Sequence, residues 1–194
     1  DVAHRNGMKM HVDGARFANA VSHLDCTPAE LTWKAGVDVM SFGGTKNGCW
    51  CAEAVVFFDR AAAENAPFIR MRAGHLLSKS RLLAAQFIAY LEDGLWLELA
   101  GISNARAAQL AAGLKASGKA KVLADPMGNE VYAIWPVTTG DKLRAGGALF
   151  YPWAPDPAAS DFRLQPGMEL ARLVTGFTTT QEEVEDLVGL VAAS

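Results

Sequence analysis

One lysine of this chain stands in a setting that could make it a nucleophile. Lys46 follows a short apolar run and lies in the glycine-framed stretch Ser41-Phe42-Gly43-Gly44-Thr45-Lys46-Asn47-Gly48. Flanking glycines let the backbone approach a flat ligand, and a partly buried amine is a usable nucleophile toward an aldehyde. The stretch is not a phosphate-binding loop, because Thr45 precedes the lysine and that motif needs Gly-Lys-Ser/Thr. Although most lysines are solvated surface charges, this context favours a Schiff-base lysine for pyridoxal phosphate.

A carboxylate and a guanidinium lie upstream, in His11-Val12-Asp13-Gly14-Ala15-Arg16. Taken alone, Asp13 is well explained as a turn former at the end of a strand. A pyridoxal ring, however, needs a carboxylate beside its nitrogen, and such a contact is worth roughly 4 kcal/mol at about 4 Å. Arg16 could hold the ring's phenolate oxygen or a substrate carboxylate in a fork. The three side chains together therefore point to pyridoxal phosphate chemistry.

The elements that must position these residues alternate as in an α/β domain with an open sheet. We expect strands over Met8–Asp13, Val37–Phe42 and Ala54–Phe58, and a helix from about Pro28 to Ala35 that Thr27 caps and Gly36 ends. Period-two alternation places His11 and Asp13 on one face of the first strand. Ligands of such sheets collect at the carboxyl ends of strands, where Asp13 and Lys46 both fall.

The second half of the chain is expected to form a smaller α+β unit. Helical periodicity begins near Ser78, continues to Leu91 and is interrupted at Gly94; a second helix then runs from Trp96 to about Ala116. We place the domain boundary there, so that residues 1–95 belong to a large α/β domain and residues 96–194 to a linking helix and a small domain. Short strands are expected over Val131–Trp135, Leu149–Tyr151, Phe162–Gln165 and Arg172–Thr175, and a last helix, capped at Thr180, ends near Ala192.

Composition argues against several classes of partner and site. The 18 basic and 21 acidic residues give a net charge of -3 without a dense basic run, so a nucleic-acid surface is not expected. No apolar stretch reaches the roughly 20 residues of a membrane span, and no signal segment opens the chain, so we expect a cytoplasmic protein. Cys26, Cys49 and Cys51 are expected to be reduced, buried thiols rather than metal ligands.

Four segments together carry a family resemblance: His11–Ala20, Ser41–Gly48, Arg72–Lys79 and Arg172–Thr175. They resemble the low-specificity L-threonine aldolases, which belong to the aspartate-aminotransferase-like (fold type I) pyridoxal phosphate enzymes. The resemblance spans nearly the whole chain, and its first two motifs are specific in this order. It implies the C-terminal part of a large cofactor-binding α/β domain, followed by a small α+β domain.

The resemblance also implies a role for individual residues. Lys46 matches the Schiff-base lysine, Asp13 the partner of the pyridine nitrogen, and Arg16 the arginine that contacts the phenolate oxygen or the substrate carboxylate. Arg172 matches a second carboxylate-binding arginine, although its other explanation is an exposed charge at the end of a strand. Thr45 and His11 are expected beside the cofactor, with His11 packing under the ring.

The chain departs from the family pattern in two places. Lys79 or Arg81 stands where a basic residue reaches the phosphate across a dimer interface, yet many members have Gly-Gly-Gly-Met-Arg where this chain has Gly74-His75-Leu76-Leu77-Ser78-Lys79. In the family, an N-terminal segment holds the phosphate and supplies a histidine that stacks on the ring; this chain does not contain it. We therefore expect the sequence to be the C-terminal portion of a longer enzyme.

The expected activity is that of a lyase that cleaves L-threonine or L-allo-threonine into glycine and an aldehyde. The family builds its sites between subunits, so a homo-oligomer, either a dimer or a tetramer, is expected. Asp13 and Lys46 would equally serve another fold type I enzyme, either a β-eliminating lyase or an aminotransferase. A further alternative is a catalytically incomplete fragment that acts only as a folded oligomerisation portion.

Overall fold

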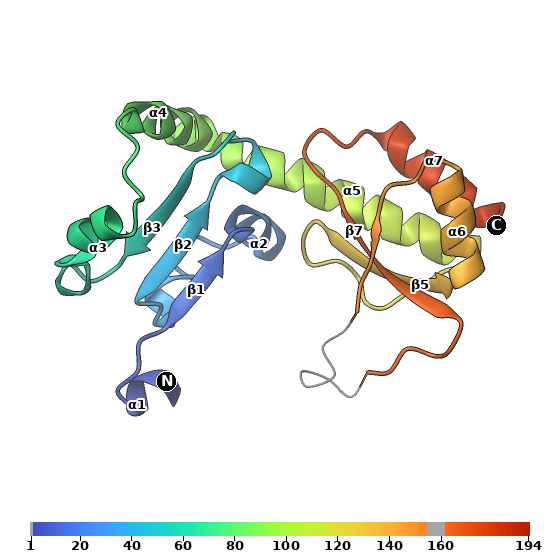
Figure 1. The fold of residues 1–194 in the computed structure, drawn as a ribbon, viewed down its shortest axis with the longest axis horizontal. Helices are drawn as coiled ribbons and strands as arrows, with labels where there is room; N and C mark the ends of the chain where they lie inside the picture. The colour runs from blue at the N-terminus through green and yellow to red at the C-terminus, as the bar shows by residue number, and fades with distance from the viewer. Residues whose placement is uncertain (1, 155–161) are drawn as a thin grey trace. The chain divides into compact units, whose positions relative to one another are not determined.

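A computed structural model describes residues 2–154 and 162–194 of the chain. The chain divides into two compact units, Asp1–Gly101 and Ile102–Ser194, and each has its own hydrophobic core. The long helix α5 (Leu95–Ser117) begins in the first unit and ends in the second, close to its expected bounds (Figure 1). No helix among the described residues has both the length and the apolar character of a membrane span.

The first unit is built on a three-stranded sheet in the order β1-β2-β3. Its strands are β1 (His11–Gly14), β2 (Val39–Gly43) and β3 (Glu53–Phe57), and helix α1 (Val2–Arg5) precedes them. β1 and β2 are parallel, with Asp13 opposite Ser41, whereas β3 is antiparallel to β2. The three expected strands are therefore confirmed. β1 begins at His11 rather than Met8, because the Met10 N–H donates to the Asp38 side chain (2.8 Å) instead of to the ladder.

An aromatic cluster forms the core of the first unit on one face of this sheet. Helix α2 (Phe17–Leu24), helix α4 (Ser80–Leu91) and the start of α5 contribute to it. Phe42 of β2 is central, with its ring centroid 5.7–6.2 Å from those of four other rings, Phe17, Phe87, Tyr90 and Trp96. Such ring pairs add about 0.5–1.5 kcal/mol each beyond the burial of their area. The end of β2 that leads to Lys46 is thus fixed by the core.

The expected helix from Pro28 to Ala35 is wrong. Thr27 and Glu30 do exchange the capping hydrogen bonds, with the Thr27 N–H 2.8 Å from the Glu30 carboxylate. The Thr32 hydroxyl, however, donates to the Pro28 carbonyl (2.7 Å), which an α-helix would pair with the Thr32 N–H. The chain forms turns and then only the 3-10 helix η1 (Trp33–Ala35), which ends at Gly36 (φ 90°) as expected.

Three short helices connect the remaining elements of the first unit. They are η2 (Thr45–Asn47), η3 (Ala61–Ala63) and α3 (Ala66–Arg72). The expected helix from Ser78 is confirmed as α4, although it begins at Ser80. The one-turn helix η4 (Glu92–Gly94) follows it, where Asp93 (φ 50°) and Gly94 (φ 77°) break the helical path.

The second unit packs helices α5, α6 (Val137–Ala145) and α7 (Gln181–Ala192) against one face of a four-stranded antiparallel sheet (Figure 1). The strands are β4 (Lys121–Val122), β5 (Glu130–Pro136), β6 (Tyr151–Pro152) and β7 (Met168–Val174), in the order β4-β5-β7-β6. Residues alternate along β5 and β7, so that Val131, Ala133 and Trp135 enter the core. The expected α+β unit is present.

Two expectations for the second unit need correction. Phe162–Gln165 is not a strand; it has no regular structure and leads into a turn at Pro166-Gly167 (Gly167 φ 80°). The strand expected over Leu149–Tyr151 is observed as β6, which covers only Tyr151–Pro152, and its hydrogen bonding to β7 continues at Trp153, whose N–H donates to the Leu170 carbonyl (2.7 Å). By contrast β5, β7 and α7 confirm the expected elements, and Thr180 and Glu183 form the complete capping box of α7.

Candidate functional site

The parallel pairing of β1 and β2 brings Asp13 and Lys46 to the same edge of the sheet. Asp13 is the penultimate residue of β1, and its register partner Ser41 lies in β2. β2 ends at Gly43, and Lys46 follows three residues later in the middle of η2. The carboxyl ends of two neighbouring parallel strands thus carry a carboxylate and a primary amine, as the sequence predicts.

His11 and Asp13 lie on the face of β1 that the core leaves open. Both are exposed, whereas Val12 between them packs against the aromatic core. One carboxylate oxygen of Asp13 accepts a hydrogen bond from the Ala15 N–H (3.0 Å), so the side chain does form a turn. This bond uses Oδ1 alone, and the second oxygen can serve another partner. Arg16, half-buried, stands at the N-terminus of α2 just beyond this turn.

The turn that carries Lys46 is anchored to buried groups below it. Asn47 is buried, and its amide donates to the Tyr90 hydroxyl (2.7 Å) and to the Trp96 carbonyl (2.8 Å). Burial raises the pKa of Tyr90, so its hydroxyl stays protonated at neutral pH. Gly48 follows with φ 119°, and a Cβ there would lie 2.8 Å from Leu99. Asn47 and Gly48 therefore fix the backbone directly after Lys46.

A second set of hydrogen bonds fixes the backbone just after this turn. The side-chain oxygen of Gln86, on α4, accepts hydrogen bonds from the Trp50 N–H (2.9 Å) and the Cys51 N–H (3.2 Å). Cys49 is buried, and burial raises the pKa of its thiol. Cys51 is exposed, so the expectation of buried thiols is wrong for Cys51. The described residues contain no group of three or more side chains that could hold a metal ion.

Lys46 itself is exposed, which corrects the expectation of a partly buried amine. Within the described part of the chain its amine has no hydrogen bond or ion pair, because Asn47 rather than Lys46 turns inward. Glu53 lies beside the turn, and its carboxylate accepts from the Thr45 N–H (3.3 Å). Sequence reasoning missed Glu53, although its position opposite Gly43 follows from a hairpin between β2 and β3.

Thr45 and Lys79, two further candidates, differ in their relation to Lys46. Thr45 is exposed and begins η2, next to the lysine. Lys79 and Arg81 are exposed at the start of α4, whereas Tyr90, which contacts the turn, lies near its other end. At 1.5 Å per residue the two ends are about 15 Å apart. The chain therefore brings Thr45, but not Lys79 or Arg81, to the Lys46 turn.

Arg172, in the second unit, is held by a carboxylate and an aromatic ring. Its Nε donates to Glu130 Oε1 (2.8 Å), its Nη2 makes a second short contact with the same oxygen, and the guanidinium lies 4.9 Å from the Trp153 ring centroid. The bonds to Glu130 raise the pKa of Arg172, which keeps it charged. Neither Glu130 nor Trp153 was among the sequence candidates; the pairing of β5 with β7 is the signal that could have found Glu130.

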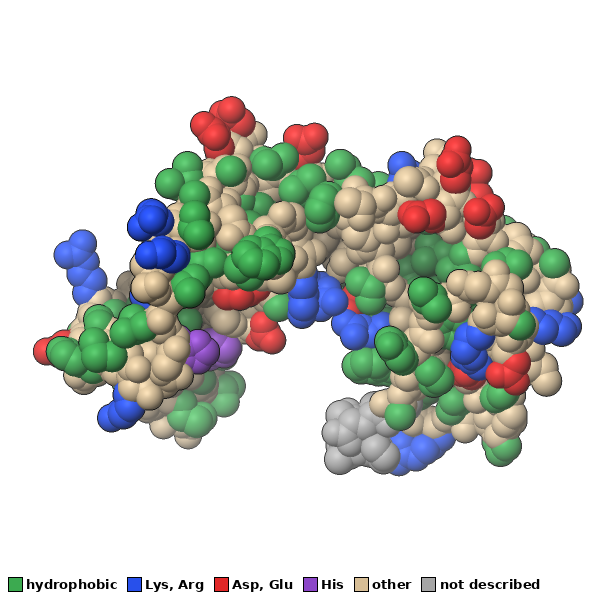
Figure 2. Space-filling model, turned by 45° about the horizontal axis from the view of Figure 1, so that its top comes forward, with side chains coloured by type: hydrophobic (Ala, Val, Ile, Leu, Met, Phe, Trp, Pro, Cys, Tyr) green, Lys and Arg blue, Asp and Glu red, His purple; other side chains and the backbone are tan. Residues whose placement is uncertain are grey.

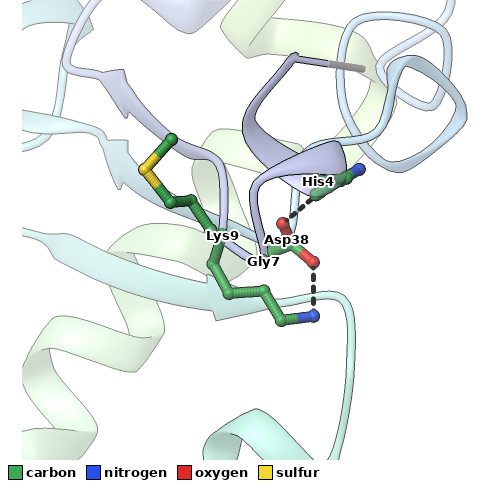
Figure 3. Close-up of a pocket in the computed structure, with 5 residues that line it drawn as sticks. His4, Gly7, Lys9 and Asp38 are labelled. Carbon is green, nitrogen blue, oxygen red and sulfur yellow. Dashed lines mark hydrogen bonds and ion pairs between the residues drawn. The ribbon is translucent and has the colours of Figure 1, made fainter.

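A charged cluster at the opposite end of β1 and β2 is structural (Figure 3). Asp38 accepts hydrogen bonds from the Met10 N–H (2.8 Å), His4 (2.7 Å) and Lys9 (3.0 Å). These bonds, that from Met10 first, hold the pKa of Asp38 far below its ordinary range. The cluster lines a shallow pocket with Gly7 and Met8, and it ties α1 to the start of β2.

Comparison with known proteins relates the chain to a described protein family. A family profile described as beta-eliminating lyase matches residues 1–133. The chain is 46% identical over 146 residues to the low specificity L-threonine aldolases of Pseudomonas sp. (strain NCIMB 10558) and Pseudomonas aeruginosa. Each alignment covers 75% of this chain and 42% of the relative, so the chain spans less than half the length of these curated relatives.

Solved structures show the same fold. A Leishmania major threonine aldolase superposes with a TM-score of 0.86 at 29% identity, over 98% of this chain and 53% of that one. A Sphingomonas wittichii serine palmitoyltransferase gives a TM-score of 0.67 at 15% identity, over 99% and 48%, a likeness that concerns the fold alone. The chain has the α/β fold of the fold type I enzymes, as expected.

Proposed function

The chain belongs to the beta-eliminating lyase family, and on that basis we propose that it is part of a pyridoxal phosphate-dependent threonine aldolase. The reaction would cleave L-threonine or L-allo-threonine into glycine and an aldehyde. The observation that carries the proposal is the position of Asp13 and Lys46 at the adjoining carboxyl ends of two parallel strands. The 46% identity of the chain to the low specificity L-threonine aldolases of Pseudomonas supports the substrate class.

The side chains at this edge suit the cofactor chemically. Lys46 offers a primary amine on a rigid turn, Asp13 has a carboxylate oxygen to spare, and His11 shares the face of Asp13. Lys46 would hold pyridoxal phosphate as a Schiff base, Asp13 would keep the ring nitrogen protonated, and His11 and Thr45 would lie beside the cofactor. When bound, the cofactor supplies an electron sink for the cleaved Cα–Cβ bond.

Two arginines would recognise the substrate. Arg16 and Arg172 can each bind an α-carboxylate through the fork of a guanidinium, whose charge persists at every pH of interest. Lys46, which would hold the cofactor, would also carry a proton at its Nζ atom once the substrate is bound. No described contact singles out a base for the β-hydroxyl proton, so we assign that role to none of these residues.

We also propose that the protein is a homo-oligomer, either a dimer or a tetramer, that associates through α3 and α4. Hydrophobic side chains lie open over this region of the first unit (Figure 2), and they include Phe68 (70% exposed), Leu82 (60%) and Ile88 (69%). Large hydrophobic side chains left exposed on two consecutive helices commonly mark an interface. Lys79 and Arg81 flank it, where either could reach the phosphate of a neighbouring subunit.

Light scattering tests the oligomer. The double variant Phe68→Asp/Ile88→Asp should lower the molecular mass in solution, because each carboxylate would be buried unpaired at the interface. Leu24→Asp changes a leucine of α2 that is also exposed (55%) but lies outside α3 and α4, and it is the control. A mass that the double variant leaves unchanged would contradict the proposal.

Absorbance tests the assignment of Lys46. Lys46→Ala should abolish the visible band that pyridoxal phosphate gains when it is linked to a lysine. Lys34→Ala is a closely matched control, because Lys34 is also the middle residue of a three-residue 3-10 helix followed by a glycine with positive φ. If Lys46→Ala keeps the band, the assignment is wrong; absence of the band from the unaltered protein would instead favour the oligomerisation portion.

The family description itself favours one alternative reaction, β-elimination. Asp13 and Lys46 would serve it equally, so the products must decide. Acetaldehyde and glycine from L-threonine support the aldolase, whereas ammonia and pyruvate from L-serine support the β-eliminating lyase. Transfer of the amino group to an oxo acid would indicate an aminotransferase.

A further inference from the structure

We propose that Glu130 and Trp153 are positioning residues that aim the Arg172 guanidinium at the α-carboxylate of the substrate. This inference rests on the proposed role of Arg172 in carboxylate binding. It concerns two residues that show no motif in the sequence and that the structure brings to Arg172 from β5 and from the end of β6.

The contacts with Glu130 occupy only one edge of the guanidinium. A guanidinium presents five N–H donors in a fixed plane. Nε and Nη2 are directed to a single oxygen, Glu130 Oε1. The outer edge, formed by Nη1 and the second hydrogen of Nη2, is the edge that binds a carboxylate in a bidentate fork. Glu130 thus sets the plane and direction of Arg172 without competing for its outer edge.

Trp153 holds the same group by its face. The guanidinium lies 4.9 Å from the ring centroid, and the ring in turn meets Tyr132 edge-on at 6.2 Å. The Trp153 N–H donates to the Leu170 carbonyl (2.7 Å), so the backbone under this ring is tied to β7 itself. Arg172 and Glu130 keep 27% and 25% of their side-chain surface exposed, which leaves the cluster open to a ligand.

A second arginine–glutamate cluster lies in the same unit, and there the carboxylate occupies the outer edge of the guanidinium. Arg144 binds Glu169 through two nitrogens and two oxygens (3.1 and 3.0 Å), and it lies 5.1 Å from the Phe150 ring centroid. Glu169 keeps only 8% of its side-chain surface exposed, and it also accepts from the Trp135 indole (3.0 Å). The Arg144 fork is therefore occupied on its outer edge by a carboxylate, whereas the carboxylate of Glu130 takes only the inner edge of Arg172, whose other hydrogen-bonding neighbour is Tyr132.

The test compares two small ligands of the protein with bound cofactor. Glycine carries the carboxylate and methylamine lacks it, so the ratio of their dissociation constants, measured by calorimetry, reports carboxylate recognition. Glu130→Ala should weaken glycine binding on the order of tenfold, and Glu130→Gln, which keeps Oε1, about threefold or less. Trp153→Ala should weaken it about threefold, and Trp153→Phe should restore most of that loss. Methylamine binding should not change.

The outcomes separate the possible failures. If glycine and methylamine weaken together, or if Glu130→Ala tightens glycine binding, Glu130 does not position Arg172 and the inference is overturned. If Arg172→Ala leaves the ratio unchanged, the carboxylate role of Arg172 is wrong and the inference falls with it. If the ratio responds as expected but L-threonine is not cleaved, the inference stands and only the proposed reaction fails. Glu169→Gln is the control and should leave the ratio unchanged.

Discussion

The Lys46 turn and the Arg172 cluster both present a cation on a well-anchored scaffold, but they treat the charge in opposite ways. At the turn, the anchoring bonds come from Asn47 and from the backbone, and within the described residues the lysine amine is left without a partner. In the cluster, the cation itself is held, by Glu130 at one edge and by Trp153 at one face.

This difference matches what each kind of chemistry requires. An amine that is to form a covalent bond must lose its proton, and a carboxylate partner would oppose that loss. A guanidinium that is to recognise an anion must stay charged and correctly aimed, and a carboxylate partner favours both. A carboxylate bonded to the cation itself, present at Arg172 and absent at Lys46 among the described residues, therefore distinguishes a candidate recognition group from a candidate nucleophile.

The sharpest way to break the comparison is to exchange the two cations, starting with Lys46. Lys46→Arg keeps the charge, but a guanidinium does not form the Schiff base, so kcat should fall by at least about a thousandfold. Steady-state cleavage of L-threonine measures it. A variant with more than a tenth of the original kcat would show that Lys46 is not the covalent group.

The next largest effect concerns the free energy of unfolding, and it compares the Arg172 cluster with the Arg144 cluster. Glu169→Ala would leave the Trp135 indole N–H without its acceptor in the core, and it should lower the free energy of unfolding by about 3 kcal/mol. Glu130→Ala, at a half-exposed pair, should cost about 1 kcal/mol. Urea denaturation of both variants gives the comparison. Equal losses would mean that the Arg172 cluster is as structural as the Arg144 cluster.

Asn47→Ala tests whether the anchors of the turn matter for the lysine. The change removes two buried hydrogen bonds and should cost about 2 kcal/mol of unfolding free energy, together with cofactor affinity. Asn129, which is also buried and donates to the Thr175 carbonyl (2.7 Å), is its counterpart in the second unit. Asn129→Ala removes one such bond and should cost about 1 kcal/mol while leaving cofactor affinity unchanged. A loss of affinity in both variants would refute a specific role for Asn47.

Arg172→Lys is the second exchange of a cation, the counterpart of Lys46→Arg. Lysine keeps the charge but loses the planar fork, so KM for L-threonine should rise by about tenfold while kcat changes less. Initial rates over a range of L-threonine concentrations up to saturation separate the two constants. A fall in kcat that matches Lys46→Arg would give Arg172 a role in the chemical step instead.

The smallest expected effect lies in the charged cluster around Asp38. Because hydrogen bonds hold its pKa below the ordinary range, Asp38 contributes stability above about pH 4 that is lost as the pH falls and the carboxylate is protonated. Asp38→Asn should therefore be slightly less stable at neutral pH and should lose less stability on acidification. Urea denaturation at pH 7 and pH 3 measures this, and an identical dependence on pH in both proteins would contradict it.

The sequence predicts the fold well where each element follows a regular pattern. Apolar alternation and caps locate β2, β3, β5, β7, α5 and α7, and the parallel pairing of β1 with β2 follows from an α/β alternation. The helix expected at Pro28–Ala35 does not form: the Thr32 N–H donates to the Ala29 carbonyl (3.3 Å), and the Thr32 hydroxyl competes for the Pro28 carbonyl that an α-helix would pair with that N–H. Propensity does not include such a local competition.

The candidate site is predictable only in part, for a related reason. Lys46 and Asp13 stand out because each lies in a short motif, and the structure places them at the same edge. Glu130 lies 42 residues from Arg172, and Gln86 lies 36 from Trp50, so neither contact has a local signal. The exposure of Lys46 was also mispredicted, since it depends on Asn47 taking the inward position. Contacts between residues that lie far apart in the sequence can be identified only once the strands and helices have been placed.

The opposite exposures of Cys49 and Cys51 have a practical consequence for spectroscopy. Cys51 is exposed, Cys49 is buried and Cys26 is intermediate, so a thiol-reactive fluorophore or fluorine label should couple at Cys51 first. After Cys26→Ser, a single natural attachment point would remain, five residues beyond Lys46 and on backbone that Gln86 holds. The protein thus carries its own reporter position, from which the arrival of a cofactor at the turn could be followed without engineering a new cysteine.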